Sequence, residues 1–234
     1  MLYLGGKGRA GKYIAEAILA HTTNYKEKTY VEPFLGGGNA FKHIAPNFKN
    51  AIASDIHPDL MMCWEAVRSG WVPPTSVSEE EYKAQQYAAP SAIRGFVGYG
   101  CSFGGKFFGG FARSKQNVGN YYANHASNSL VEISKHMTNT HLECCSFDWW
   151  NDVVDNNCVV YCDPPYANTT GYKNKFNSEY FWQIVNGWCD IGATVFVSEY
   201  YSPDGWEPIW EKSIRRKVSG GTGKMTTEKL FVRK

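Results

Sequence analysis

A carboxylate, two prolines and an aromatic ring stand together in Asp163-Pro164-Pro165-Tyr166. They directly follow an apolar run at 159–162 that predicts a buried strand. The prolines end the strand and hold the next backbone units in a fixed, non-helical conformation. Asp163 and the Pro164 carbonyl then offer two acceptors beside an aromatic ring. An amino group on a planar base needs this set, because acceptors take its hydrogens and a ring stacks on its face. The alternative is a simple proline turn.

A second motif joins a predicted strand to a predicted helix through Gly36-Gly37-Gly38. Glycines at such a turn let a ligand approach the backbone and the positive N-terminal end of the helix. The next predicted strand ends in Asp55, whose carboxylate can accept hydrogen bonds from both hydroxyls of a ribose. Glu32, just before the turn, would repel a pyrophosphate but suits a cationic ligand such as S-adenosylmethionine.

Residues 6–12 fit the pattern G-x-x-x-x-G-K of a nucleotide phosphate loop. Tyr13 stands where that loop needs Ser or Thr to hold magnesium, which argues against a phosphate loop. Two interpretations are left: a basic N-terminal turn, or a part of the same site as the other two motifs.

These motifs need a sheet that brings them to one edge. The order strand, glycine turn, helix, strand and acid is a βαβ unit, typical of a parallel α/β sheet. The predicted strands are 29–34, 50–55, 142–145, 159–162 and 194–199, then an antiparallel pair at 214–218 and 229–233. The predicted helices are 12–20, 39–44, 58–68, 78–87, 130–139 and 176–189. The stretch 95–128, rich in Gly, Asn and aromatics, shows no clean period and predicts an irregular, functional insertion.

Composition limits the class of protein. The 234 residues, 43% of them hydrophobic, suit one domain with a modest insertion. No apolar run approaches the roughly 20 residues that span a bilayer, and the N-terminus lacks an apolar signal core, so we expect a cytoplasmic protein without a membrane partner. The net charge of +2 is too small to predict nucleic acid by itself, whereas 15% aromatic residues hint at base stacking. The seven cysteines form no Cys-x-x-Cys pair and predict small buried hydrophobes, with a zinc site as the alternative.

The order of the motifs resembles one known family. Gly-Gly-Lys, Tyr-Val-Glu-Pro-Phe-Leu-Gly-Gly-Gly, Ser-Asp-Ile and Tyr-Cys-Asp-Pro-Pro-Tyr follow one another between Tyr3 and about Phe176. This series resembles the Dam-type, or D12 class, DNA adenine-N6 methyltransferases of the alpha order. The resemblance implies an α/β fold, a Rossmann-like S-adenosylmethionine-dependent methyltransferase sheet with an inserted, mostly helical target-recognition region. It also implies S-adenosylmethionine as methyl donor and double-stranded DNA as partner, in methylation of the restriction-modification kind.

The resemblance assigns roles to the residues that match its motifs. The catalytic residues it implies are Asp163, Pro164 and Tyr166. The donor-binding residues it implies are Tyr3, Lys7, Glu32, Phe34, Gly36, Gly38, Asp55, Ile56, Phe147 and Asp163. Ile56 and Phe147 would hold the donor's adenine between them, and Asp55 would bind its ribose. Tyr166, Tyr172 and Phe176 are the candidates that would contact the flipped target adenine, and no metal is expected.

The domain boundaries expected on this basis place the catalytic domain at 1–72 and 141–234, around a target-recognition insertion at 73–140. Within the insertion, Lys106, Arg113 and Lys115 lie among Phe and Gly residues and are expected to contact DNA. The alternative is a loop whose aromatic rings are tucked into the core. This segment reads Ser-Phe-Gly-Gly-Lys-Phe-Phe-Gly-Gly where Dam has an Asn-Gly-Leu-x-Arg type of sequence. The DNA target sequence therefore does not carry over.

Three other functions are compatible with parts of the pattern: a DNA cytosine-N4 methyltransferase, an RNA methyltransferase, and a DNA-binding protein that has lost catalysis. Ser more often replaces Asp163 in the first class, and Asn is common there in the second. The presence of all motif residues argues against the third. No cysteine lies in the catalytic loop, which argues against the covalent route used for methylation of a ring carbon.

Overall fold

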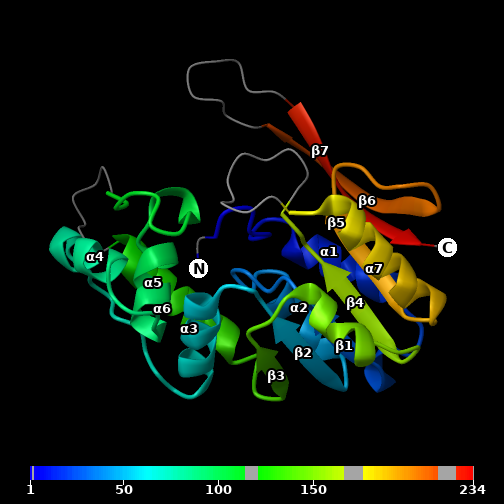
Figure 1. The fold of residues 1–234 in the computed structure, drawn as a ribbon, viewed down its shortest axis with the longest axis horizontal. Helices are drawn as coiled ribbons and strands as arrows, with labels where there is room; N and C mark the ends of the chain where they lie inside the picture. The colour runs from blue at the N-terminus through cyan, green and yellow to red at the C-terminus, as the bar shows by residue number, and fades with distance from the viewer. Residues whose placement is uncertain (2, 114–120, 166–175, 216–224, 234) are drawn as a thin grey trace.

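The computed structural model describes residues 1, 3–113, 121–165, 176–215 and 225–233 (Figure 1). Within them the chain forms a seven-stranded sheet in the order β3-β2-β1-β4-β5-β7-β6. The strands are β1 (Thr29–Glu32), β2 (Asn50–Ser54), β3 (Thr140–Glu143), β4 (Cys158–Cys162), β5 (Thr194–Glu199), β6 (Trp206–Arg215) and β7 (Met225–Arg233). The five neighbouring strands β3, β2, β1, β4 and β5 run parallel. Strand β7 lies between β5 and β6 and is antiparallel to both. A closing antiparallel pair is present as predicted, but its register differs: residues 229–233 pair with 206–211, whereas Ile214 and Arg215 pair with Thr226 and Met225. Residues 216–218 of the predicted strand lie outside the described residues.

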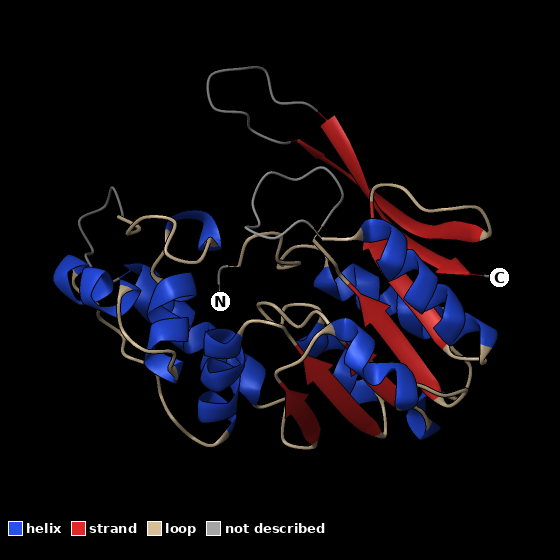
Figure 2. Cartoon of the chain, viewed as in Figure 1, coloured by secondary structure: helices blue, strands red, loops and turns tan. Residues whose placement is uncertain are grey.

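Helices cover both faces of the sheet (Figure 2). They are α1 (Gly11–Ala20), α2 (Phe41–Ile44), α3 (Pro58–Arg68), α4 (Glu79–Gln86), α5 (Ala92–Gly100), α6 (Tyr121–Ser134) and α7 (Ser178–Asp190), with short 3-10 turns η1 (Tyr25–Glu27), η2 (Ala45–Asn47), η3 (Phe103–Gly105) and η4 (Phe147–Asp152). Side chains of α1 and α2 share one core with Tyr161 of β4, and those of η4 and α7 share another with Val160. Neighbouring residues of β4 thus face opposite cores, which explains its unbroken apolar sequence.

The stretch predicted as irregular contains helix α5 and the first part of α6, which corrects the sequence interpretation. The helix predicted at 130–139 in fact begins at Tyr121 and ends at Ser134. Three glycines weaken the helical pattern of α5, but packing against α3 favours the helix. A Cβ atom on Gly95 would lie 2.0 Å from the carbonyl oxygen of Asp59, so glycine is what allows α5 to approach α3.

A partly buried ion pair joins α5 to α3. Arg94 of α5 donates from Nη1 to Asp59 Oδ2 of α3 at 2.6 Å, and the backbone N–H of Ser91 donates to Oδ1 at 2.9 Å. The Arg94 guanidinium also lies over the rings of Phe107 and Phe108, 5.2 and 5.5 Å from their centroids. One guanidinium therefore fixes α3, α5 and the loop after α5 relative to one another.

All seven cysteines are free. Cys63, Cys101, Cys158 and Cys162 are buried, as predicted for small hydrophobes, whereas Cys144 is exposed and Cys145 and Cys189 are half-buried, which corrects the prediction for these three. In the part of the chain that the structure describes, no three His, Cys, Asp or Glu side chains are grouped so that they could hold a metal ion. Among the described residues, every helix is too short or too polar to cross a membrane.

Candidate active site

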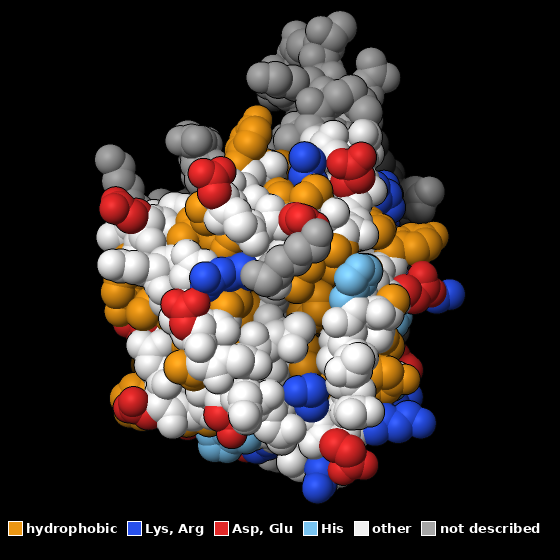
Figure 3. All heavy atoms as spheres, turned by 90° about the vertical axis from the view of Figure 1, so that its right-hand side faces the viewer, with side chains coloured by type: hydrophobic (Ala, Val, Ile, Leu, Met, Phe, Trp, Pro, Cys, Tyr) orange, Lys and Arg blue, Asp and Glu red, His pale blue; other side chains and the backbone are white. Residues whose placement is uncertain are grey.

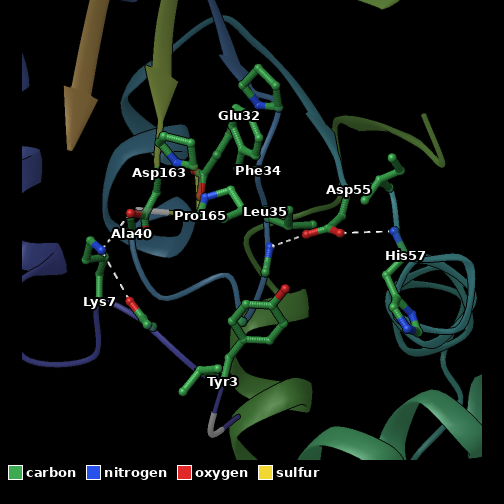
Figure 4. A pocket seen from close by; sticks show the side chains of 18 of the residues that line it. Tyr3, Lys7, Glu32, Phe34, Leu35, Ala40, Asp55, His57, Asp163 and Pro165 are labelled. Carbon is green, nitrogen blue, oxygen red and sulfur yellow. Dashed lines mark hydrogen bonds and ion pairs between the residues drawn. The ribbon is translucent and has the colours of Figure 1, made fainter. Parts of the chain in front are cut away.

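The carboxyl ends of β1, β2 and β4 border a cavity of about 830 Å³ (Figure 4). Ligands bind at this edge in open α/β sheets. The sequence-predicted residues that line the cavity are Tyr3, Lys7, Glu32, Phe34, Gly36, Asp55, Ile56, Phe147, Asp163, Pro164 and Phe176. Gly38 does not line it, but its φ of +65° turns the chain toward α2. Three motifs that are far apart in the sequence thus meet in one cavity.

The most polar part of the cavity is a cluster around Lys7. Its ammonium lies 2.6 Å from Asp163 Oδ1 and 2.9 Å from Glu228 Oε1, and it donates to the carbonyl of Gly5 at 3.2 Å. Lys7 is 6% exposed. Burial alone would lower the pKa of Lys7, but the charges of Asp163 and Glu228 outweigh it, and the pKa is raised. Lys7 is therefore a fixed positive charge beside the Asp163 carboxylate.

Glu32 lies at the buried floor of the same cavity. Its Oε2 accepts a hydrogen bond of 2.5 Å from the hydroxyl of Tyr30. Burial, together with the nearby charge of Asp163, raises the pKa of Glu32 well above its usual range, although the Tyr30 bond and Lys7 act in the opposite direction. A cationic ligand beside a carboxyl group with a raised pKa lowers that pKa and favours the ionised form.

Asp55 fixes the glycine turn from the end of β2. Its Oδ2 accepts from the backbone N–H of Gly36 at 3.0 Å and its Oδ1 accepts from the N–H of His57 at 3.1 Å (Figure 4). Burial raises the pKa of Asp55, and these backbone donors oppose the rise. The Trp64 indole donates to the Gly36 carbonyl at 2.9 Å. Both carboxylate oxygens are thus held by backbone, so the side chain is rigid before any ligand binds.

Aromatic rings form the wall on one side of Asp55. Phe147 stacks on Phe34 with 5.4 Å between ring centroids, and Phe176 meets Phe34 edge-on at 6.0 Å. Ile56, the predicted partner of Phe147, is 72% exposed and lies at the rim. The structure therefore brings Phe147 and Ile56 to the same cavity. It also places Phe176, a candidate for the target base, among the rings beside Phe147.

Tyr3 closes the cavity over the glycine turn. A Cβ atom on Gly36 would come within 2.8 Å of the Tyr3 ring, so only glycine permits this contact. On its other side Tyr3 contacts Tyr99 of α5, with ring centroids 5.0 Å apart. The neighbouring Leu4 N–H donates to the carbonyl of Gly105 at 3.1 Å. The N-terminal segment thus connects the cavity to the inserted helices.

Sequence reasoning missed several lining residues. They are Asn39, His57, Tyr99, Tyr200 and Glu228. Tyr200 directly follows the predicted strand 194–199, so its position at the carboxyl end of a parallel strand could have been predicted from the sequence. Glu228 gave no such signal, because the predicted strand began one residue after it.

Three predicted site residues, Tyr166, Tyr172 and Lys115, lie outside the described residues. Of the other two predicted DNA contacts, Lys106 is exposed, and Arg113 is exposed and ion-paired with Glu79. The rings of Phe107, Phe108 and Phe111 pack against the core, whereas that of Phe103 is 73% exposed. The loop therefore combines both interpretations drawn from the sequence: most rings are tucked inward, and its described cations face solvent.

A sheet of this order with one reversed strand, and a cavity at the carboxyl ends of β1, β2 and β4, define a Rossmann-like methyltransferase. Residues 3–92 and 99–184 match the D12 class N6 adenine-specific DNA methyltransferase family, so the chain belongs to that family and is an adenine-specific DNA methyltransferase. This confirms the resemblance predicted from the motifs and disfavours the cytosine, RNA and non-catalytic alternatives.

Two relatives found by sequence are named as DNA adenine methylase or Type II methyltransferase. The chain is 28% identical to a DNA adenine methylase of Escherichia coli K12, covering 97% of this chain and 94% of the relative. It is 25% identical to the Type II methyltransferase M.CviBI of Paramecium bursaria Chlorella virus NC1A, over 82% and 84% of the two chains. Among solved structures, the rRNA methyltransferase AviRa of Streptomyces viridochromogenes aligns with a TM-score of 0.49 and 12% identity, over 99% of this chain and 86% of that one.

Proposed function

We propose that this enzyme transfers a methyl group from S-adenosylmethionine to N6 of an adenine that is flipped out of double-stranded DNA. The observation that carries the proposal is the meeting of Asp163 and Pro164 with Asp55 and Glu32 in one cavity. The proposal includes work in the cytoplasm of a bacterial or phage-infected cell, and target recognition by the insertion at 73–140.

The residues of the cavity fit S-adenosylmethionine. Its volume of about 830 Å³ lies within the roughly 300–1,000 Å³ usual for small-molecule sites. Four carboxyl side chains and one lysine line it, which suits a ligand with sulfonium and ammonium charges. In the proposal, Asp55 binds the ribose hydroxyls, Ile56 and Phe147 hold the adenine, and the glycine turn and Tyr3 form the floor and cover. Bound there, S-adenosylmethionine supplies an electrophilic methyl group.

The chemical task of the chain is to make a poor nucleophile reactive. The lone pair on the exocyclic nitrogen of adenine is delocalised into the ring. Asp163 and the Pro164 carbonyl accept the two amino hydrogens, which favours a tetrahedral nitrogen and frees its lone pair for the methyl group. These acceptors are fixed by β4 and its two prolines, so little reorganisation is needed during the reaction.

The target base must leave the duplex, at a cost of a few kcal/mol. We assign part of the compensation to stacking on Tyr166, worth roughly 1–3 kcal/mol, with Tyr172 and Phe176 as further candidates. Tyr200 joins them as a candidate, because this aromatic side chain also lines the cavity.

The product tests the proposed function. Purified enzyme, S-adenosylmethionine and duplex DNA should yield 6-methyladenine without an added divalent metal and in the presence of a chelator. The motivation is the pair of fixed acceptors and the absence of metal-ligand spacing in the sequence. Mass spectrometry of nucleosides from treated DNA and RNA measures the outcome. Formation of 4-methylcytosine, methylation of RNA alone, or loss of activity with the chelator would contradict the proposal.

The loop after α5 is the proposed DNA contact. Figure 3 shows the face at the opposite side, where described acidic and basic side chains are interspersed. Replacing Lys106, Arg113 and Lys115 together by Ala should flatten the slope of log affinity against log salt by about 2–3 units, because each phosphate contact contributes about 0.7–0.9. The exposed pair of Arg113 with Glu79 is too weak to prevent this exchange.

A matched control uses three exposed lysines near the start of β1, β2 and β3, at the other edge of the sheet. They are Lys26, Lys49 and Lys135. Their joint replacement by Ala removes the same charge and should leave the salt slope near that of the wild type. Equal slopes for the two triple variants would exclude the loop as the DNA contact.

A further inference from the structure

Glu228 is a buried carboxylate for which the proposed chemistry has so far no role. It lies on β7, is 5% exposed, and shares the α1 side of that strand with Leu230. A buried carboxylate is costly unless charges or donors compensate it. The Lys7 ammonium, 2.9 Å from Oε1, supplies this compensation.

Lys7 holds three segments of the chain together. An ammonium group has three donor hydrogens, and the structure offers three acceptors: Asp163 Oδ1, Glu228 Oε1 and the Gly5 carbonyl. The loop before α1, the end of β4 and the middle of β7 therefore meet at one nitrogen atom. The position of Asp163 Oδ1 depends on this nitrogen, which in turn depends on Glu228.

The charge of Glu228 matters as much as its position. With Lys7 alone, Asp163 would belong to a neutral ion pair, and its oxygens would be weaker acceptors. A second carboxylate on the same ammonium leaves the group of three with a net negative charge, which raises the affinity of Asp163 for protons. A stronger acceptor draws more strongly on an amino hydrogen in the transition state.

Other titratable groups surround Asp163. Burial holds the pKa of Tyr161 and of Cys162, both on β4, well above the usual range, so both are neutral. Burial also raises the pKa of Glu32 on β1. Glu199 on β5 and Lys229 on β7 are opposite each other in the strand register, and their side chains alternate to the face away from Glu228. Lys7 and Glu228 are therefore the charged pair that acts most directly on Asp163.

We propose that Glu228 is a positioning residue, which through Lys7 holds Asp163 in place and keeps it a strong acceptor for the amino hydrogen of the target base. This inference rests on the proposed function, because it assumes that Asp163 accepts that hydrogen.

The test is Glu228→Gln, which keeps the shape and an acceptor for Lys7 but removes the charge. The turnover number should fall about tenfold. This is smaller than the roughly 10²- to 10⁴-fold rate effect of a positioned proton acceptor, because Asp163 itself remains in the variant. The dissociation constant of the donor, measured by titration calorimetry, should change by less than about threefold, because the variant retains every proposed donor contact. Loss of a neighbouring negative charge lowers the pKa of Asp163, so the acidic limb of the turnover–pH profile should move to lower pH.

Two variants serve as comparisons. Glu211→Gln removes an exposed carboxylate from the neighbouring strand β6 and should leave turnover and profile unchanged. Glu228→Asp keeps the charge but shortens the side chain, so it should lower turnover while the acidic limb stays at the wild-type pH. If Glu228→Gln does not fold, Glu228→Asp alone tests whether Glu228 positions Asp163.

Other outcomes would overturn the inference. An unmoved acidic limb in Glu228→Gln would make Glu228 a structural residue, and a weakened donor affinity with unchanged turnover would make it a donor ligand. A displaced limb in Glu228→Asp would exclude the charge argument. The proposed function fails separately, if the wild-type enzyme forms no 6-methyladenine.

Discussion

Turnover of the Asp163→Ala enzyme is expected to fall by ~100-fold or more, as when one preorganised polar group is lost from an active site. The lost acceptor acts on a hydrogen whose bond polarises as the nitrogen attacks, so its contribution is largest in the transition state. Single-turnover kinetics with saturating donor and DNA measure the chemical step directly.

The structure also indicates that this variant should fold. Removal of the Asp163 carboxylate leaves Lys7 with Glu228 at 2.9 Å and the Gly5 carbonyl at 3.2 Å, so the buried ammonium keeps a counter-charge. Thermal unfolding provides the check. Asp163→Asn is the matched comparison, because it keeps the shape but replaces one acceptor oxygen by an amide group that donates. If either variant turns over at the wild-type rate, Asp163 is not the acceptor.

Asp55→Ala is expected to weaken donor binding by roughly 10- to 100-fold, which corresponds to about 1.5–3 kcal/mol for hydrogen bonds to a charged group. Two effects act together. The ribose loses its acceptor, and the N–H groups of Gly36 and His57 lose the carboxylate that fixes the glycine turn. Because both effects persist from the bound state to the transition state, turnover at saturating donor should change much less.

Titration calorimetry with the donor, beside turnover at saturating donor, separates the two quantities. Asp152→Ala is the matched control, since Asp152 is exposed on η4 and does not line the cavity. It should bind the donor as the wild type does. An unchanged dissociation constant in Asp55→Ala would rule out the ribose assignment.

The parts of the site that were predictable from the sequence are those carried by contiguous motifs. The glycine turn, Asp55 and Asp163 each follow directly on an apolar strand, and parallel strands end at the same edge of a sheet. Side-chain alternation and turn chemistry are local, so they can be read without knowledge of the fold.

The parts that were missed depend on packing between distant segments. Helix α5 has a poor helical sequence and is stabilised by its contact with α3, where Gly95 meets the backbone of Asp59. Glu228 reaches the cavity only because β7 enters the sheet between β5 and β6. Neither contact leaves a periodic signal in the segment itself, so single-sequence patterns could not predict them.

The ion pair of Lys7 with Glu228 joins residues that are synthesised at opposite ends of the chain. Lys7 is synthesised long before Glu228, and β6 cannot take its final place until β7 has inserted beside β5. Contacts between residues so distant in sequence slow folding, because the entropy of closing a long loop must be lost before the contact forms. A nascent chain still on the ribosome therefore lacks the group that completes the cluster around Asp163. The cluster of Lys7, Asp163 and Glu228 is therefore complete only after β7 has been synthesised and has paired with β5.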